Sequence, residues 1–230
     1  MPHHLTAGAR GTDSALLAVH AALRELRARL GADPEGPVDV AAAVKRTGGD
    51  EVVAEAVTRA PGQPPEASDR MRRGLVAPVG PEYPGFVSFS FIAHFTEVRV
   101  EPVTRRIRVS RMVSVADGGR VAGPVAAESQ VRGGVVWGIG AALREHSEAD
   151  PRYGGLVDDD LADSVIPVDA DVGTIDVDFI DEPGHPLDPM GVTNLGEVAL
   201  VGVAPAIANA VFHATGRRVR RLPIRIEDVL

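Results

Sequence analysis

The 230-residue sequence contains no cysteine. The chain therefore cannot form a disulfide, use a thiol nucleophile or hold an iron–sulfur cluster through its own thiolates. It also lacks an excess of basic residues, since the formal net charge is -8 at pH 7. A chain of this charge without a basic stripe is not expected to bind nucleic acid. Any electron relay must lie on another chain.

Long apolar runs and export signals are missing as well. No uninterrupted apolar stretch reaches the roughly 18 residues of a membrane span, and the N-terminus does not join a basic segment to an apolar one. We therefore expect no membrane partner and a cytoplasmic location, or a periplasmic one if a partner chain carries an export signal. What remains is an ordinary globular composition, 44% hydrophobic, in a chain long enough to bury a core.

The sequence also lacks a metal-binding motif. None of the seven histidines has the His-Glu-x-x-His spacing of a metal-binding helix. Aspartates cluster at Asp158, Asp159, Asp160 and Asp163, but without calcium-loop spacing they are typical of a solvated acidic loop. We assign no metal ligand to this chain.

Residues 1–60 are predicted to be helical. Apolar residues recur at helical spacing over 16–30, directly after Thr12 and Ser14, which are candidate N-cap residues. Capping alone would explain both hydroxyls. The N-terminus of a helix can also receive a phosphate group through its backbone donors.

Two more short helices are predicted over 38–46 and 51–58. Residues 61–85 then carry six prolines with little periodicity. This composition predicts a surface connection between the helical part, 1–60, and an α/β part, 86–230.

Strands are predicted at the start of the α/β part. Apolar residues alternate with small or polar ones at Val87, Phe89, Phe91 and Phe95. A turn near 102–105 then predicts an antiparallel hairpin with one buried face.

Helices and strands are mixed in the remainder of this part. Helices are predicted over 125–146 and 203–215, the second capped by Gly216, with a strand over 175–180. The expected fold is α+β, with helices packed on small, mainly antiparallel sheets.

The helix over 125–146 contains four glycines, each of which costs up to about 1 kcal/mol relative to alanine. They are Gly133, Gly134, Gly138 and Gly140. Glycines are tolerated in such numbers where a neighbouring backbone must approach closely, so we expect another element to pack against this helix.

Residues 191–197 read Gly-Val-Thr-Asn-Leu-Gly-Glu and run into an apolar segment. Gly191 and Gly196 allow a ligand to approach the main chain closely. Glu197 is expected at the start of a helix, partly buried against Val198 and Leu200, where burial would tune it as a general base. The alternative is that the carboxylate only complements the helix dipole.

Three stretches resemble the molybdenum hydroxylases, the xanthine dehydrogenase and aldehyde oxidase family. Residues 129–140, Ser-Gln-Val-Arg-Gly-Gly-Val-Val-Trp-Gly-Ile-Gly, match its Gly-Gln-x-x-Gly-Gly-x-x-x-Gly-Leu-Gly text. Residues 191–197 match its catalytic loop except at Thr193 and Asn194, where the family has lysine and glycine. Residues 93–98 match its Ala-His-Phe-Ala-Glu-Val text, where His94 and Glu97 are given a mainly architectural role and no place in the active site.

The resemblance implies a site residue by residue. Glu197 is the implied catalytic base beside a molybdenum centre. Gln130 and Gly196 would bind the cofactor, a molybdopterin or its cytosine dinucleotide, and Thr12 and Ser14 would contact its nucleotide part. The implied reaction oxidises an aldehyde or an N-heterocycle with oxygen from water.

The resemblance also implies partners. The family's molybdenum subunit is far longer, so residues 1–230 resemble its C-terminal molybdopterin-binding domain, without the hammerhead domain and the first cofactor-binding half. We expect a complementary N-terminal half on another chain, together with an iron–sulfur subunit and an FAD subunit. The isolated chain is expected to be inactive. The alternatives are a truncated relic and a non-catalytic assembly or scaffold module with a vestigial site.

Overall fold

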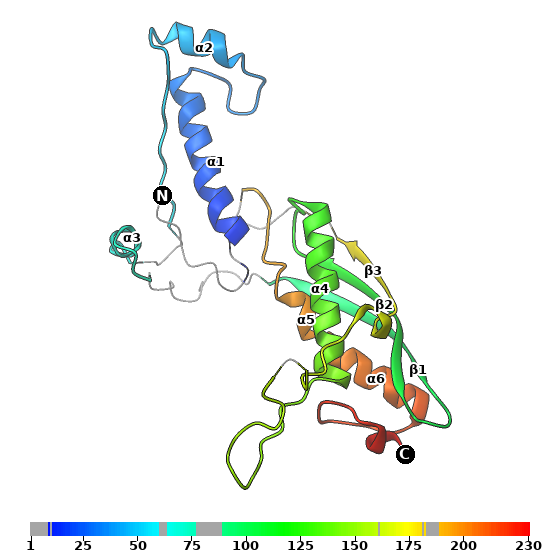
Figure 1. Cartoon of the computed structure of the whole chain (residues 1–230). Coiled ribbons are helices and arrows are strands. Elements are labelled where there is room, and N and C mark those ends of the chain that lie inside the picture. The colour runs from blue at the N-terminus through cyan, green and yellow to red at the C-terminus, as the bar shows by residue number, and fades with distance from the viewer. Residues whose placement is uncertain are drawn as a thin grey trace. The chain divides into compact units, whose positions relative to one another are not determined.

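The computed structural model describes residues 9, 11–59, 64–76, 89–160, 162–180, 182 and 189–230. The chain divides into two compact units. The helical unit comprises residues 1–89 and 183–193, and the sheet unit comprises residues 90–182 and 194–230. Figure 1 labels the helices and strands of both units.

The helical unit contains α1 (Gly11–Arg29), α2 (Val40–Arg46) and α3 (Ala67–Arg72). α1 confirms the first predicted helix, and the chain leaves it through Gly31, whose φ of 60° is left-handed. The apolar stripe of α1 is incompletely covered, because Val19 and Leu23 are 52% and 51% exposed. Within the described residues, α1 therefore does not bury its stripe in a core.

The second and third predicted helices have different outcomes. The second is confirmed as α2, which Asp39 caps by accepting a hydrogen bond from the Ala42 amide at 3.0 Å. The third is wrong, because residues 51–58 are not helical and their exposure largely alternates as in an extended chain. Val53 is β-branched, which disfavours helix, and its carbonyl accepts a hydrogen bond from the Arg29 guanidinium at 2.7 Å.

The predicted proline-rich connection, 61–85, is only partly described. It contains the short helix α3, whereas residues 61–63 and 77–85 lie outside the described residues, as does Val87.

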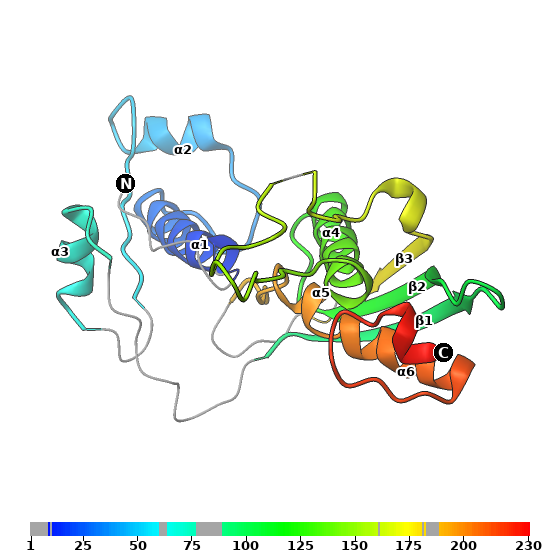
Figure 2. The ribbon, with the colours of Figure 1, turned by 60° about the horizontal axis from the view of Figure 1, so that its bottom comes forward.

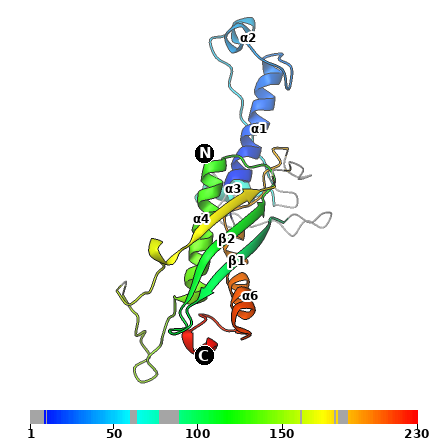
Figure 3. The same ribbon diagram turned by 90° about the vertical axis from the view of Figure 1, so that its right-hand side faces the viewer.

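The sheet unit is built on one three-stranded sheet in the order β1-β2-β3. β1 (Phe91–Val100) and β2 (Ile107–Asp117) form the predicted antiparallel hairpin, whereas β3 (Thr174–Phe179) runs parallel to β2. The second pairing is parallel because the chain crosses over through α4 (Pro124–Leu143) between these strands. The α+β fold is confirmed, and the sheet is mixed with the antiparallel pairing as the longer one (Figure 3).

One face of the sheet carries the core. Helix α4 and helix α6 (Val203–Thr215) both contribute buried residues to the cluster that covers the buried residues of β2 and β3. The buried members are Val109, Met112, Val135, Ile139, Ala142, Ile175, Val203, Ile207, Val211, Ile224 and Val229. The last two come from the C-terminal segment, which ends in the turn η2 (Ile226–Val229) beside α6 (Figure 2). Gly216 ends α6 with a φ of 73°, as predicted.

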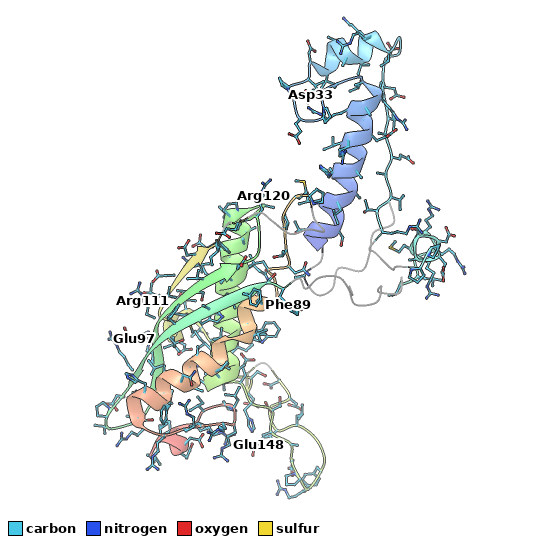
Figure 4. The ribbon with its side chains drawn as sticks, turned by 180° about the vertical axis from the view of Figure 1, so that it is seen from behind. Asp33, Phe89, Glu97, Arg111, Arg120 and Glu148 are labelled. Carbon is cyan, nitrogen blue, oxygen red and sulfur yellow. The ribbon has the colours of Figure 1, made fainter. Side chains whose placement is uncertain are left out.

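The phenylalanines of the predicted alternation lie on the other face. Phe91 and Phe95 are 62% and 64% exposed, whereas Ile92 and His94 point to the core side. Figure 4 shows this hairpin with Glu97 of β1 labelled. The expected single buried face is therefore present, but it uses the opposite set of β1 residues.

The stretch Val198–Thr215 is apolar enough, by length and composition, to span a membrane. The sequence prediction found no such run because Asn209 and His213 interrupt it. In the structure the stretch is two helices, α5 (Val198–Val201) and α6, and α6 is buried in the core of the sheet unit through one side. That packing accounts for the apolar residues on the buried side of α6, which are Val203, Ile207 and Val211.

Candidate cofactor site

Glu197 occupies the N-cap position of α5, as expected. Its side chain accepts no capping hydrogen bond, so capping does not explain why a glutamate is there. The expectation of partial burial is wrong, because the residue is exposed and Val201 beside it also faces solvent. Among the described residues, the carboxylate has neither a hydrogen-bond nor an ion-pair partner. It is therefore available to a group outside this chain.

Gln130 is bonded to the residue that precedes Glu197. Its side-chain Nε2 donates a hydrogen bond to the Gly196 carbonyl at 3.0 Å, across 66 residues of sequence. Gly196 directly precedes Glu197, so this bond ties the exposed face of α4 to the start of α5. The structure thus brings together three of the predicted site residues, Gln130, Gly196 and Glu197.

Two glycines of α4 allow α5 and α6 to approach it closely. A Cβ atom at Gly134 would lie 2.6 Å from the Cβ of Ala199, and one at Gly138 would lie 2.5 Å from the Cβ of Val203. Such distances exclude any larger residue unless a backbone moves. The predicted packing against the glycine-rich helix is confirmed at these positions.

Gly133 has a different environment. It is exposed, and a Cβ built there would have no atom within 4 Å outside the local helix backbone. It lies one helical turn after Gln130 and one before Trp137, which is 61% exposed. Packing within the sheet unit therefore does not explain this glycine, although a ligand approaching the helix backbone would.

The loop before Glu197 contains a packed residue, Leu195, and a buried polar group without a partner among the described residues, in Asn194. Leu195 packs on the backbone after β2, where a Cβ at Gly118 would lie 2.9 Å from Leu195 Cδ1. The side-chain oxygen of Asn194 is buried and has no hydrogen-bond partner among the described residues. A buried acceptor of this kind requires a donor. A pterin, which carries ring N–H and amino groups, fits that requirement.

Thr12 and Ser14 lie in the helical unit, inside α1 and not before it. The helix begins at Gly11, so the expectation that either residue is the N-cap is wrong. Thr12 is exposed in the first turn, where backbone N–H groups have no acceptor within the helix. Because the two units are described separately, the structure does not join Thr12 and Ser14 to the groups around Glu197.

His94 and Glu97, the two residues that we left out of the active site, lie on opposite faces of strand β1. Glu97 lies on the exposed face of the sheet and takes part in an ion pair with Arg99 at 3.7 Å. His94 lies on the core side, with Nδ1 2.8 Å from the Ser114 hydroxyl. Burial lowers the pKa of His94, and the adjacent Ala199 backbone offsets part of that shift. Ala199 belongs to α5, the helix whose N-cap is Glu197. The sequence did not predict that His94 lies beside this helix.

The family is established by comparison with known proteins. The profile of the molybdopterin cofactor-binding domain matches residues 1–173. The chain belongs to this family, and the predicted resemblance to the molybdenum hydroxylases is confirmed. The matched range includes Thr12, Ser14 and Gln130 but ends before Gly196 and Glu197.

Several relatives of this chain are named as molybdenum-binding subunits of oxidoreductases. The aldehyde oxidoreductase molybdenum-binding subunit PaoC of Escherichia coli (strain K12) is 43% identical over 141 residues, which are 61% of this chain and 19% of that subunit. The aldehyde oxidoreductase of Desulfovibrio desulfuricans superposes with a TM-score of 0.62 at 26% identity, over 89% of this chain and 21% of that one. Quinoline 2-oxidoreductase of Pseudomonas putida superposes with a TM-score of 0.53 at 31% identity, over 57% of this chain and 17% of that one. The chain thus spans about a fifth of the proteins that it matches.

Proposed function

We propose that this chain is the C-terminal cofactor-binding portion of a molybdenum-dependent hydroxylase. The substrate would be an aldehyde or an N-heterocycle, and the added oxygen would come from water. The observation that carries the proposal is the convergence of Gln130, Gly196 and Glu197 at the junction of α4 and α5. Relatives named for the oxidation of aldehydes and of quinoline support these two substrate classes.

Residues around that junction would hold a molybdopterin. Gln130 keeps its side-chain carbonyl available while its amide binds Gly196, and Asn194 offers a buried acceptor that no described residue satisfies. Gly133 leaves the adjacent surface of α4 open to a planar ring. Thr12 and Ser14 would bind the nucleotide part, in the cytosine dinucleotide form of the cofactor, at the first turn of α1.

The chemistry divides between the cofactor and Glu197. When bound, the cofactor supplies the two-electron oxidation. Glu197 would act as general base, with a carboxylate oxygen accepting a proton as the water-derived oxygen is transferred to the substrate carbon. A positioned base of this kind contributes about 10²- to 10⁴-fold in rate. The exposure of Glu197 supports this role, because an exposed carboxylate is accessible to a ligand.

We infer that other chains complete the enzyme. A complementary N-terminal half of the molybdenum subunit would be one partner, which is supported by relatives named as molybdenum-binding subunits. The chain has no cysteine, so iron–sulfur clusters, and FAD beyond them, would be carried by partner chains that remove the electrons.

A second candidate function is a non-catalytic assembly or scaffold module with a vestigial site. Thr193 and Asn194 favour it, since both depart from the pattern of the family's catalytic loop. The unsatisfied oxygen of Asn194 is the feature on which the two functions differ. It is an acceptor for the cofactor in an enzyme and has no such role in a scaffold.

Metal analysis of an assembled complex separates these functions. The chain is co-expressed with the chain that matches the remaining length of its relatives, and molybdenum is measured in the purified complex. We expect near-stoichiometric molybdenum, a several-fold loss in Gln130→Ala, and no loss in Ser129→Ala, which changes an exposed neighbour on the same helix. A wild-type complex that assembles without molybdenum would support the scaffold instead.

A further inference from the structure

His94 is a histidine of the sheet unit whose ring is enclosed between a strand and a helix junction. It lies on the core side of β1, directly opposite Ser114 of β2 in the strand register. The Ser114 side chain is fully buried and lies 2.8 Å, through its hydroxyl, from Nδ1 of the ring. The other ring nitrogen, Nε2, is also shielded from solvent. A partly buried imidazole with a shielded Nε2 and an Nδ1 in contact with a buried hydroxyl must match a donor and an acceptor to its surroundings.

The His94 ring lies directly against Gly202, at the junction of α5 and α6. A Cβ at this position would lie 2.6 Å from His94 Cδ2 and 3.3 Å from Nε2. Its φ of -89° and ψ of -10° are helical values that any residue adopts. Backbone conformation therefore does not require glycine here, whereas the imidazole does. The ring occupies the space that a side chain at position 202 would fill.

Helix α5 is consequently held from two sides. Ala199 is fully buried and packs on Gly134 of α4, where an added Cβ would come within 2.6 Å. Gly202, three residues later, lies against the His94 ring, and the Ala199 backbone raises the pKa of His94 against the larger lowering by burial. The Leu200 amide donates to the Glu197 carbonyl at 3.3 Å, so the first turn of α5 links this held segment to the candidate base.

We propose that His94 is a positioning residue for Glu197. The ring is neutral and carries its proton on Nε2. Nδ1 accepts the hydrogen bond from the Ser114 hydroxyl, and the Nε2 side of the ring packs against the backbone at Gly202, directly after α5. The imidazole thereby fixes α5 against β1 and sets the position of the carboxylate at the start of that helix. The role of Glu197 rests on the proposed function, whereas the state of the ring and its hold on α5 are properties of this chain alone.

Chemistry favours this tautomer. A neutral imidazole offers one donor and one acceptor, and a hydroxyl can donate to Nδ1 whereas a backbone carbonyl can only accept from Nε2–H. Nε2 has no hydrogen-bond partner among the described residues, so the packing of the ring against Gly202 is what holds α5 in this structure. Burial lowers the pKa of the ring, which agrees with a neutral form.

The first test reads the ring directly in the full chain. Nitrogen-15 spectra of histidine-labelled protein, with His94 assigned by its loss in His94→Asn, report protonation and tautomer. We expect a neutral ring at pH 7 with the proton on Nε2. A charged ring, or a proton on Nδ1, would overturn the proposal.

The second test measures what the ring does to α5. The amide of Asn can replace Nδ1 opposite Ser114 but does not reach Ala199, so His94→Asn should speed amide exchange at residues 199–202 by about tenfold or more. His94→Gln, whose amide reaches further, should restore part of the protection. His213→Asn, the same change at an exposed histidine of α6, should have no effect. Unchanged exchange in α5, or equal acceleration at the core amides of α6, would show that His94 does not position this helix.

A third measurement separates this inference from the proposed function. In an assembled complex, the His94→Asn variant should have the molybdenum content and the KM of the wild type but a lower kcat. If turnover requires Glu197 but is unchanged in His94→Asn, the positioning role fails and the enzyme assignment stands. If the wild-type complex has no turnover, the proposed function fails, and the ring state and exchange in the isolated chain still decide whether His94 holds α5.

Discussion

The two units of this chain use their apolar residues differently. The sheet unit packs α4 and α6 on one face of a sheet, with Ile139 and Ile207 almost completely buried, whereas α1 of the helical unit leaves Val19 and Leu23 about half exposed. The sheet unit also contains the convergent site groups, and the helical unit contains Thr12 and Ser14. Groups that must keep a fixed geometry belong on well-packed elements. In the proposed function, the well-packed unit therefore carries the general base, and the less packed unit carries the residues that would bind the nucleotide part of the cofactor.

The largest expected difference between the units is in core truncation. Ile207→Ala removes a fully buried side chain from α6 and should lower the free energy of unfolding by about 2–5 kcal/mol. Val19→Ala truncates a half-exposed side chain of α1 and should change it by no more than about 0.5–1 kcal/mol. Urea denaturation followed by circular dichroism measures both. Equal losses would mean that α1 is as well packed as α6.

Helix α4 contains one glycine in a packed environment and one in an open environment, so substitutions at the two positions can be compared within a single helix. Gly134→Ala forces a Cβ against Ala199 and should destabilise the sheet unit by about 1–3 kcal/mol. Gly133→Ala meets no atom and should stabilise the unbound chain by up to about 1 kcal/mol, because alanine favours helix. The same denaturation experiment checks the sign of each change. If Gly133→Ala also destabilised the chain, the surface beside Gln130 would be packed and not open.

His94 makes the stability of the sheet unit depend on pH. Its pKa is lowered from 6.5 in the folded state, so the unfolded chain binds the proton more tightly. This contribution to stability is present above pH 6.5 and is lost as the pH falls through the folded-state pKa. Stability measured from pH 7.5 downward should decline over that window, and His94→Asn should flatten the decline. A decline of the same size in His94→Asn would assign it to other groups.

The smallest effect is expected in the helical unit. Thr12→Ala removes one hydroxyl from the first turn of α1, and a single hydrogen bond of about 0.5–1.5 kcal/mol corresponds to no more than about a tenfold loss of cofactor retention. Molybdenum content of the complex after dialysis measures this loss. Thr47→Ala, at an exposed threonine just after α2, is the control. A loss as large in Thr47→Ala would remove Thr12 from the site.

The secondary structure was predictable where the apolar residues follow a single helical or strand periodicity. The helices α1, α4 and α6 and the β1–β2 hairpin follow from spacing alone, and Gly134 and Gly138 mark where α5 and α6 pack. The buried face of β1 was not predictable, because both sets of alternating positions contain apolar residues. Period-two alternation does not distinguish Phe95, which is exposed, from Ile92 on the core side.

The candidate site was predictable through the resemblance and not through local chemistry. Spacing places Gln130 and Glu197 on different elements, and only the fold brings the Gln130 amide to Gly196. The exposure of Glu197 was missed because Ala199 is buried without covering the carboxylate, whereas Val201 faces solvent. The contact between His94 and α5 depends on strand register and on Gly202, neither of which is a local property of the sequence.

Turnover of Glu197→Gln in the assembled complex tests the central claim most directly, with molybdenum content measured in the same preparation. The change keeps the size of the side chain and removes its ability to accept a proton as a base. We predict that molybdenum content matches the wild type and that turnover falls by about 10²- to 10⁴-fold. Unchanged turnover in a molybdenum-loaded Glu197→Gln complex would contradict the assignment of this carboxylate as the base.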